Sequence, residues 1–305
     1  MSTLFSHFFE KINQIQPLEA NFTEVLSTIA VMPKTLYFYG KIPENVLKNG
    51  KKERPKAVAI VGSRHNTKYG EEVAYRLGYE LAKEGVIIIS GLAYGIDSIG
   101  HQAALDAGGK TIAILGTPID EIYPRNHRKL AAEIIETGGA IISEYAPGTK
   151  VYPKTSFLER NRIISGLSDI VVVVEAAEQS GSLNTATHAL EQGKEVFAVP
   201  GNITSPYSQG CNKLIRQGAF PYTEPDDILR ELFPEEFLAR KKKCHLKGDT
   251  DVETLILNSL ASGLRSGEEI MRETHLPPEV FNQSVTLLEI KGRIRALGAN
   301  AWALN

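Results

Sequence analysis

Ala57-Val58-Ala59-Ile60-Val61-Gly62-Ser63-Arg64 is the stretch of this 305-residue chain that decides its fold class. An uninterrupted apolar run, rich in β-branched residues, leads into a glycine, a hydroxyl group and a guanidinium, and a polar segment then opens a helix. This pattern is typical of a buried parallel strand, and open α/β sheets bind ligands at the carboxyl ends of their strands. The turn would suit a phosphate oxygen, because glycine admits a close approach and the polar groups can donate. The alternative is a tight turn followed by a solvated charge.

The same pattern recurs along the chain up to about residue 234. Short apolar strands alternate with segments of helical length, and this alternation predicts a doubly wound, mostly parallel sheet of the α/β class. The strands are expected at 58–61, 86–89, 111–115, 140–142, 170–174 and 196–199, and the helices at 70–84, 98–107, 127–137, 157–167 and 183–192. Right-handed crossovers would then place every strand-to-helix loop on one rim of the sheet.

The composition is that of an ordinary globular chain with little charge bias. The formal net charge is −2, so anion binding would have to rest on local basic patches. Cys211 and Cys244 lie far apart, without the spacing of a zinc site or a disulfide framework, which favours a reducing cytoplasm. The apolar spacing of residues 4–15 predicts an amphipathic helix, and the sequence shows neither a signal peptide nor a membrane-spanning run. We expect a cytoplasmic protein without a membrane partner.

The expected rim loops share glycine and hydroxyl residues, and several add a cation. They include Ser90-Gly91, Gly116-Thr117, Ser143, Ser180-Gly181-Ser182 and Gly201. A single loop of this kind is usually an ordinary turn, but several along one edge predict a groove that binds phosphates. Aromatic rings and cations are interleaved in this region: Tyr94, Tyr123, Tyr145, Tyr152 and Phe157 with Arg64, Arg125, Arg128, Lys129, Lys154, Arg160 and Arg162. Such a row can track a single-stranded backbone and stack its bases. Alternatively, each ring belongs to the core, and Arg160 and Arg162 bond loop carbonyls.

Several motifs that would indicate catalysis or a cofactor are missing from the sequence. No G-x-G-x-x-G follows the first strand and no Walker A sequence occurs, which argues against a dinucleotide or ATP. Asp97 and His101 have the spacing of a metal pair, but without a third ligand a helix-capping aspartate and a packed histidine are the better interpretation. No activated nucleophile is evident around Ser180 and Ser182. We predict a non-catalytic protein that holds its ligand without metal or cofactor.

An ordered set of motifs resembles the DNA-processing protein A (DprA/Smf) family over about residues 35–230. The motifs are Val61–Arg64, Ser90–Asp97 with His101, Tyr123-Pro124, Ser143–Tyr145, Arg160–Leu167, Ser180–Leu183 and Val196–Gly201. The resemblance implies an extended Rossmann domain that binds single-stranded DNA without sequence preference. It also implies a homodimer that protects incoming DNA during natural transformation and loads the recombinase RecA.

The resemblance also implies roles for individual residues. It places a DNA-contacting arginine at Arg64, a lysine at Lys154 and a base-stacking ring at Phe157. The full set expected to bind DNA or phosphate is Gly62, Ser63, Arg64, Ser90, Gly91, Lys154, Phe157, Arg160, Arg162, Ser180, Gly181 and Ser182. Thr117-Pro118 departs from the family pattern, in which a second glycine is common at that point, and the N-terminal region is short for the helical SAM-like domain of some members.

A rival hypothesis is a nucleotide-processing Rossmann enzyme that resembles nucleoside monophosphate phosphoribohydrolases. Such enzymes use glycine-rich loops with a catalytic Glu/Arg pair, which Glu144 or Glu175 beside Arg160 could imitate. We rank this hypothesis lower, because neither glutamate stands in an obviously desolvating context.

The chain after about residue 234 has a different character. We divide the sequence into an N-terminal extension (1–50), an extended Rossmann-like domain (51–235), a basic linker (236–248) and a small winged-helix domain (249–305). Three short helices and a hairpin predict the last of these, at 252–261, 267–274, 278–291 and 293–304. Residues 249–305 hold five Lys or Arg against eight Asp or Glu, whereas modules that track phosphates are usually basic. This imbalance favours protein contact or regulation over duplex-DNA recognition.

Overall fold

The computed structural model describes residues 11–48, 50–235, 237 and 246–305. The chain forms two compact units, Met1–Leu232 and Phe233–Asn305. Among the described residues, no helix is both long and apolar enough to cross a membrane.

One nine-stranded sheet organises the first unit, in the order β1-β2-β8-β7-β6-β5-β9-β10-β11. The strands are β1 (Asn13–Ile15), β2 (Leu36–Gly40), β5 (Ala57–Val61), β6 (Ile87–Ser90), β7 (Thr111–Ile114), β8 (Ala140–Ser143), β9 (Ile170–Val173), β10 (Glu195–Ala198) and β11 (Phe220–Pro221). Pairing is parallel from β8 to β11 and antiparallel at β1 and β2. Apart from Glu195, every residue of β5–β10 is buried, as expected for strands covered on both faces. The predicted doubly wound, mostly parallel sheet is confirmed.

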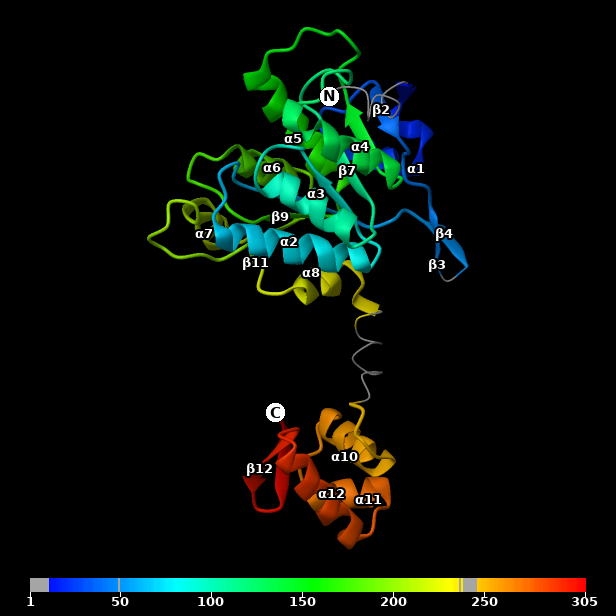
Figure 1. The fold of residues 1–305 in the computed structure, drawn as a ribbon, viewed down its shortest axis with the longest axis vertical. Helices are drawn as coiled ribbons and strands as arrows, with labels where there is room; N and C mark the ends of the chain where they lie inside the picture. The colour runs from blue at the N-terminus through cyan, green and yellow to red at the C-terminus, as the bar shows by residue number, and fades with distance from the viewer. Residues whose placement is uncertain (1–10, 49, 236, 238–245) are drawn as a thin grey trace. The chain divides into compact units, whose positions relative to one another are not determined.

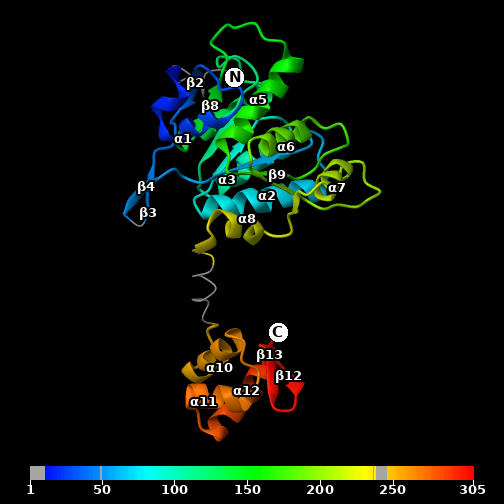
Figure 2. The same ribbon diagram turned by 180° about the vertical axis from the view of Figure 1, so that it is seen from behind.

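Helices cover both faces of this sheet (Figures 1 and 2). They are α2 (Lys68–Lys83), α3 (Ile96–Asp106), α4 (Arg128–Glu136), α5 (Pro153–Leu167), α6 (Gly181–Glu191), α7 (Gln209–Arg216) and α8 (Pro225–Leu232). Alternate strand residues such as Ala59 and Val61 pack in one core with Ile163 of α5 and Ala186 of α6. On the opposite face, Ile60 lies against Gly100 of α3. The strand alternation therefore places α5 and α6 on one face and α3 on the other.

The chain reverses its direction of winding at β5. After β5 the sheet grows through β6, β7 and β8 on one side, and the chain then returns to place β9 on the other side of β5. The loops after β5 and β9 consequently diverge at neighbouring strand ends. Such a switch point is where open α/β sheets bind ligands.

The first fifty residues complete one edge of the sheet. β2 pairs antiparallel with β8, and β1 pairs antiparallel with β2. The predicted amphipathic helix over 4–15 is wrong for residues 13–15, which form β1, and residues 1–10 lie outside the described part. Short helical turns η2 (Pro17–Glu19), α1 (Asn21–Glu24) and η3 (Val25–Thr28) follow, and β3 (Val46–Lys48) and β4 (Lys51–Glu53) form a separate hairpin.

The second unit is a winged helix, as predicted. It consists of α10 (Asp251–Ala261), α11 (Gly267–Thr274), α12 (Pro278–Ile290) and the hairpin β12 (Ile294–Gly298) and β13 (Ala301–Leu304). Thr250 caps α10 by accepting a hydrogen bond from the Glu253 N–H at 3.1 Å. Phe281 and Val285 of α12 pack on Leu257 of α10 in a core that belongs to this unit alone.

Candidate nucleic-acid interface

A cavity of about 590 Å³ lies at the switch point between β5 and β9. Its walls come mainly from the loop after β5, the loop after β9 and α5, with further residues from the loop after β6, the start of α3 and the loop after β10. The lining includes Gly62, Ser63, Arg64, His65, Phe157, Arg160, Asn161, Gln179, Ser180, Gly181, Ser182 and Tyr207. Of the rim loops predicted to converge, those after β5 and β9 line this cavity together with Ala93 of the loop after β6, whereas Ser143 and Gly201 do not line it. His65, Gln179 and Tyr207 are lining residues that the sequence patterns did not single out.

The loop after β5 is tightly held. A Cβ atom on Gly62 would lie 2.7 Å from the Ile96 side chain, so glycine is required by the close approach of α3. The Ser63 hydroxyl accepts a hydrogen bond from the His65 N–H at 3.1 Å. The buried Glu175 carboxylate, after β9, accepts from the Thr67 N–H at 2.9 Å and from the Thr67 hydroxyl at 2.5 Å. These contacts fix the start of α2 against β9.

Phe157 lies in the first turns of α5 and is partly buried between charged and aromatic neighbours. The Arg64 guanidinium carbon lies over its ring, 5.6 Å from the centroid. The Tyr123 ring centroid lies 5.5 Å from the Phe157 centroid on another side. Lys154, three residues earlier on α5, is exposed. Within the described residues, the Arg64 and Lys154 side chains make no hydrogen bond or ion pair, so both cations are available to an anion.

Arg160 has a different environment from Arg64. It is 4% exposed, and its guanidinium donates to the carbonyl of Gly91 at 2.9 Å and to the carbonyl of Ile114. Burial lowers the pKa of Arg160 to about 10. This arginine joins α5 to the ends of β6 and β7, in agreement with the alternative that it bonds loop carbonyls.

Arg162 is also engaged within the protein. Its two terminal nitrogens donate to the two Glu144 carboxylate oxygens at 3.1 and 2.6 Å, a bidentate pair between largely buried side chains. Glu144 therefore has Arg162 as its partner rather than Arg160. With Glu175 held by Thr67, neither glutamate forms the Glu/Arg160 pair of the rival enzyme hypothesis.

Ser90 and Gly91 lie beneath the rim rather than on it. The fully buried Ser90 hydroxyl donates to the Ile60 carbonyl at 2.6 Å, and the Gly91 N–H donates to the Asp97 carboxylate at 3.0 Å. The expectation that these two residues donate to a ligand is not supported by their positions, because both donors are already used inside the protein. Asp97 also accepts from the Ala93 N–H at 3.4 Å. The prediction that Asp97 caps a helix is wrong, because Asp97 lies inside α3, whose N-cap is Gly95, and both N–H groups that it binds come from the loop before the helix.

His101 is packed in the core, as predicted from the sequence. Its Nδ1 lies 2.6 Å from the Thr111 hydroxyl, and burial lowers its pKa to about 3. In the described part of the chain, no group of three or more His, Cys, Asp and Glu residues is arranged to hold a metal ion.

The loop after β9 presents the start of α6 to the cavity. Ser180 caps the helix, and its hydroxyl lies 2.8 Å from the Ser182 hydroxyl. Gly181 is exposed, and its carbonyl accepts from the Asn161 side-chain amide at 3.3 Å. The same amide donates to Asn184 of α6 at 3.1 Å. Asn161 thus holds α5 and α6 side by side beneath the cavity, a role that only the fold reveals.

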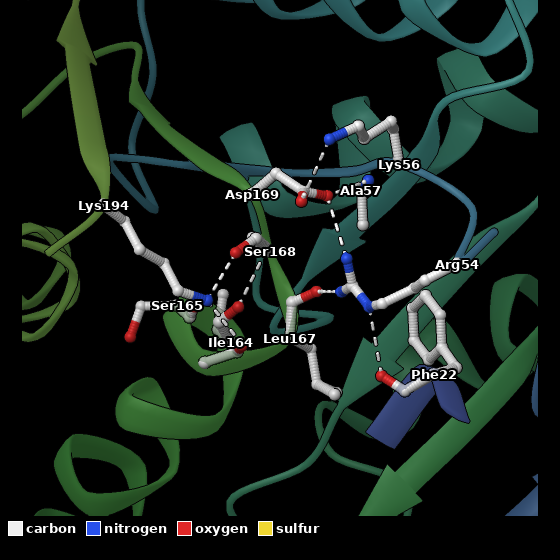
Figure 3. A network of polar contacts seen from close by, with 11 residues as sticks. Phe22, Arg54, Lys56, Ala57, Ile164, Ser165, Leu167, Ser168, Asp169 and Lys194 are labelled. Carbon is white, nitrogen blue, oxygen red and sulfur yellow. Dashed lines mark hydrogen bonds and ion pairs between the residues drawn. The ribbon is translucent and has the colours of Figure 1, made fainter. Parts of the chain in front are cut away.

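The other end of α5 is held by two cations (Figure 3). The Lys194 ammonium donates to the carbonyls of Ser165, Gly166 and Ser168 at 2.7, 2.5 and 2.5 Å. Arg54 donates to the Leu167 carbonyl and pairs with Asp169 at 3.0 Å. These cations satisfy carbonyls that a helix end leaves without intrahelical partners. The helix that carries Phe157 is therefore anchored at its middle by Arg160 and Asn161 and at its C-terminal end by Lys194 and Arg54. The sequence patterns missed Lys194 and Arg54.

Comparison with known proteins places this architecture in a family. The family model for DNA recombination-mediator protein A matches residues 13–233, and that for the DprA winged helix domain matches residues 244–300. The DNA processing protein DprA of Bacillus subtilis is 42% identical over 221 residues, covering 72% of this chain and 71% of that protein. Protein Smf of Escherichia coli is 52% identical over 176 residues, covering 57% of this chain and 46% of that protein.

A solved structure gives the same assignment. The structure of DNA processing protein A from Helicobacter pylori, described for its single-stranded DNA binding mode, superposes with a TM-score of 0.64 at 31% identity. The superposition covers 75% of this chain and 98% of that chain. The family models, the sequence identities and this structural similarity together show that the chain belongs to the DNA recombination-mediator protein A (DprA/Smf) family.

Proposed function

We propose that this protein binds single-stranded DNA at the switch-point cavity. The observation that supports the proposal most directly is the uncommitted Arg64 guanidinium over the Phe157 ring, with the exposed, uncommitted Lys154 three residues before Phe157 on α5. The cations would hold phosphates while the ring stacks on an unpaired base, the combination by which proteins bind single strands without reading sequence. The family member from Helicobacter pylori is described as binding single-stranded DNA, which agrees with this function.

We assign the predicted site residues to two roles. Arg64, Lys154 and Phe157 would contact DNA, with Gly62, Ser63 and the Ser180–Ser182 turn facing it across the cavity. Ser90, Gly91, Arg160 and Arg162 would act as positioning residues, because their polar groups are bound within the protein.

We further propose that the protein acts without catalysis. Three carboxylates of this region are already bound within the protein: Asp97 to backbone N–H groups, Glu144 to Arg162 and Glu175 to Thr67. A general base requires a carboxylate that can reach its substrate, and these are held by the fold. The rival nucleotide-processing enzyme would be favoured only by release of a free base from a nucleoside monophosphate.

Membership of the family supports the wider biological role that the sequence resemblance implied. We propose that a homodimer protects incoming single-stranded DNA during natural transformation and helps to load RecA onto it. Protection requires tight binding to single-stranded DNA of any sequence. Loading requires the same binding without sequence preference, because the recombinase must later receive the strand whatever its sequence. A test is whether the purified protein allows RecA to displace a single-strand-binding protein from DNA.

We propose that the winged helix contacts protein rather than duplex DNA. The helix α12, which would enter the major groove, contains no lysine or arginine and carries Glu279 and Glu289. Lys291, which follows it, is paired with Asp249 and Glu253 at 2.7 Å each. Duplex recognition depends largely on cations that neutralise phosphates, and this surface offers few.

The decisive experiment measures binding of a fluorescent single-stranded oligonucleotide against salt concentration. In the Arg64→Ala, Lys154→Ala double variant, affinity should fall for all sequences alike. The slope of log affinity against log salt should decrease by about 0.7 per lost phosphate contact. The matched control is Lys83→Ala, Lys110→Ala, which removes two exposed cations next to the opposite ends of the strands. Unchanged binding by the Arg64 and Lys154 variant would refute the site.

A further inference from the structure

A second cavity adjoins Phe157. Its volume is about 580 Å³, within the range of about 300–1,000 Å³ that is usual for small-molecule sites. Phe157 is a wall of both cavities, while Arg64 lines only the first and Tyr123, Lys150 and Tyr152 line only the second. The two cavities therefore meet at one aromatic ring.

The two cavities differ in chemistry. The first is lined by glycine turns, hydroxyl groups and Arg64, which suit a phosphate. The second is lined by the rings of Tyr123, Tyr152 and Phe157, and its charged residues are the exposed Lys150 and the exposed Glu121. The face of an aromatic ring binds the face of a nucleobase, whereas a phosphate gains little from it.

The aromatic residues of the second cavity are unusually open to solvent. Tyr152 is 84% exposed and Tyr123 is 46% exposed. Tyr123 lies at 45° to Phe157, so the two rings diverge rather than stack closely on each other. In the described part of the chain, the Tyr152 side chain and the Lys150 ammonium have no polar or ring partner. Neither tyrosine is needed to fill the core, and both can accept a planar ligand.

We propose that this second cavity is a subsite for another unpaired nucleobase, next to the base that stacks on Phe157. The inference rests on the proposed function and extends it: the strand would pass Phe157 with phosphates toward Arg64 and Lys154, and the following base would enter between Tyr123 and Tyr152. Lys150 would hold the next phosphate. Because the walls are ring faces, the subsite accepts any base.

The test uses the full-length protein and the shortest oligonucleotide that retains full affinity, so that the protein cannot slide away from a lesion. A single abasic site is moved along this oligonucleotide. Wild-type protein should lose affinity at two neighbouring positions, each by about 5- to 100-fold, the range that corresponds to loss of one stacked base. Tyr152→Ala should bind the intact oligonucleotide more weakly and remain sensitive at only one position.

Variants and outcomes separate this inference from the proposed function. Tyr152→Phe should behave as wild type, since it keeps the ring, and Tyr75→Ala, which removes a half-exposed tyrosine on α2, is the control. Because the Tyr152 side chain is almost fully exposed, its loss leaves the fold intact. The subsite is overturned if Tyr152→Ala binds the intact oligonucleotide as tightly as wild type does, or if wild type is sensitive to the abasic site at only one position. It is also overturned if wild type binds a free nucleoside monophosphate as tightly as it binds the oligonucleotide. If wild type does not bind single strands at all, the proposed function itself fails.

Discussion

Asp97 and Arg160 hold the two polar backbone atoms of the same residue, Gly91. The Asp97 carboxylate accepts from the Gly91 N–H at 3.0 Å, and the Arg160 guanidinium donates to the Gly91 carbonyl at 2.9 Å. A Cβ atom at this position would lie 2.4 Å from an Arg160 nitrogen, so the site requires glycine. An arginine on α5 is thereby connected to the end of β6 and the start of α3.

Replacing Arg160 with leucine should lower the free energy of unfolding by about 3–5 kcal/mol, because it leaves the buried Asp97 charge uncompensated. Urea denaturation followed by circular dichroism measures the change. Adding Asp97→Asn to Arg160→Leu should restore part of the loss, since the amide oxygen still accepts from Gly91. Arg125→Leu, at an exposed position on the rim, serves as the control. Full stability of Arg160→Leu would contradict the positioning role.

The Arg162–Glu144 pair predicts strong coupling between two residues. Both side chains are largely buried and the pair is bidentate, so a double-mutant cycle with Arg162→Ala and Glu144→Ala should give a coupling energy of about 0.5–3 kcal/mol in stability. Glu144→Ala alone frees the guanidinium and should not weaken DNA binding. A coupling energy near zero, or a large loss of DNA affinity in Arg162→Ala at unchanged stability, would mean that Arg162 serves the ligand instead.

The buried neutral His101 makes the protein sensitive to acid. Burial lowers its pKa from 6.5 to about 3, so the unfolded state binds one more proton than the folded state between those values. The resulting contribution is fully present above pH 6.5 and is lost as the pH falls below it, by up to about 1.4 kcal/mol per pH unit. Urea midpoints between pH 7.5 and 5 measure the slope. His101→Gln should reduce it, while His65→Gln, at an exposed site, should leave it unchanged.

From the hydrogen bonds that Lys194 donates at the C-terminal end of α5, we predict that this distant lysine affects DNA binding. Lys194→Met leaves carbonyls of Ser165, Gly166 and Ser168 without their donor, at an expected cost of about 1–3 kcal/mol in stability. Since α5 carries Phe157 and Lys154, hydrogen exchange in α5 should accelerate and DNA affinity should fall. Lys213→Met, an exposed lysine on α7, is the comparison. Equal protection of α5 in the two variants would show that Lys194 does not anchor the helix.

Much of the fold could be predicted because its signals are local. A strand buried on both faces must be apolar along its whole length, so β5 to β10 are visible in the sequence one by one. The short edge strand β1 escaped prediction, because its apolar spacing also fits a helix and only pairing with β2 decides its conformation. The winged helix was recognisable from three amphipathic segments and a hairpin with its own core.

The sequence by itself determined a parallel sheet whose glycine- and cation-bearing turns share one edge, because right-handed crossovers leave no other arrangement. Only the tertiary structure decided which cations remain free. Arg160 donates hydrogen bonds to the carbonyls of Gly91 and Ile114, which lie 69 and 46 residues away in the sequence. Arg162 donates to Glu144, which lies 18 residues away. Arg64 instead points over Phe157 at the rim. A guanidinium donates to the acceptors that lie within hydrogen-bond distance in the folded protein. These acceptors are far away in the sequence, so the residues that flank an arginine do not show whether it will be bound or free.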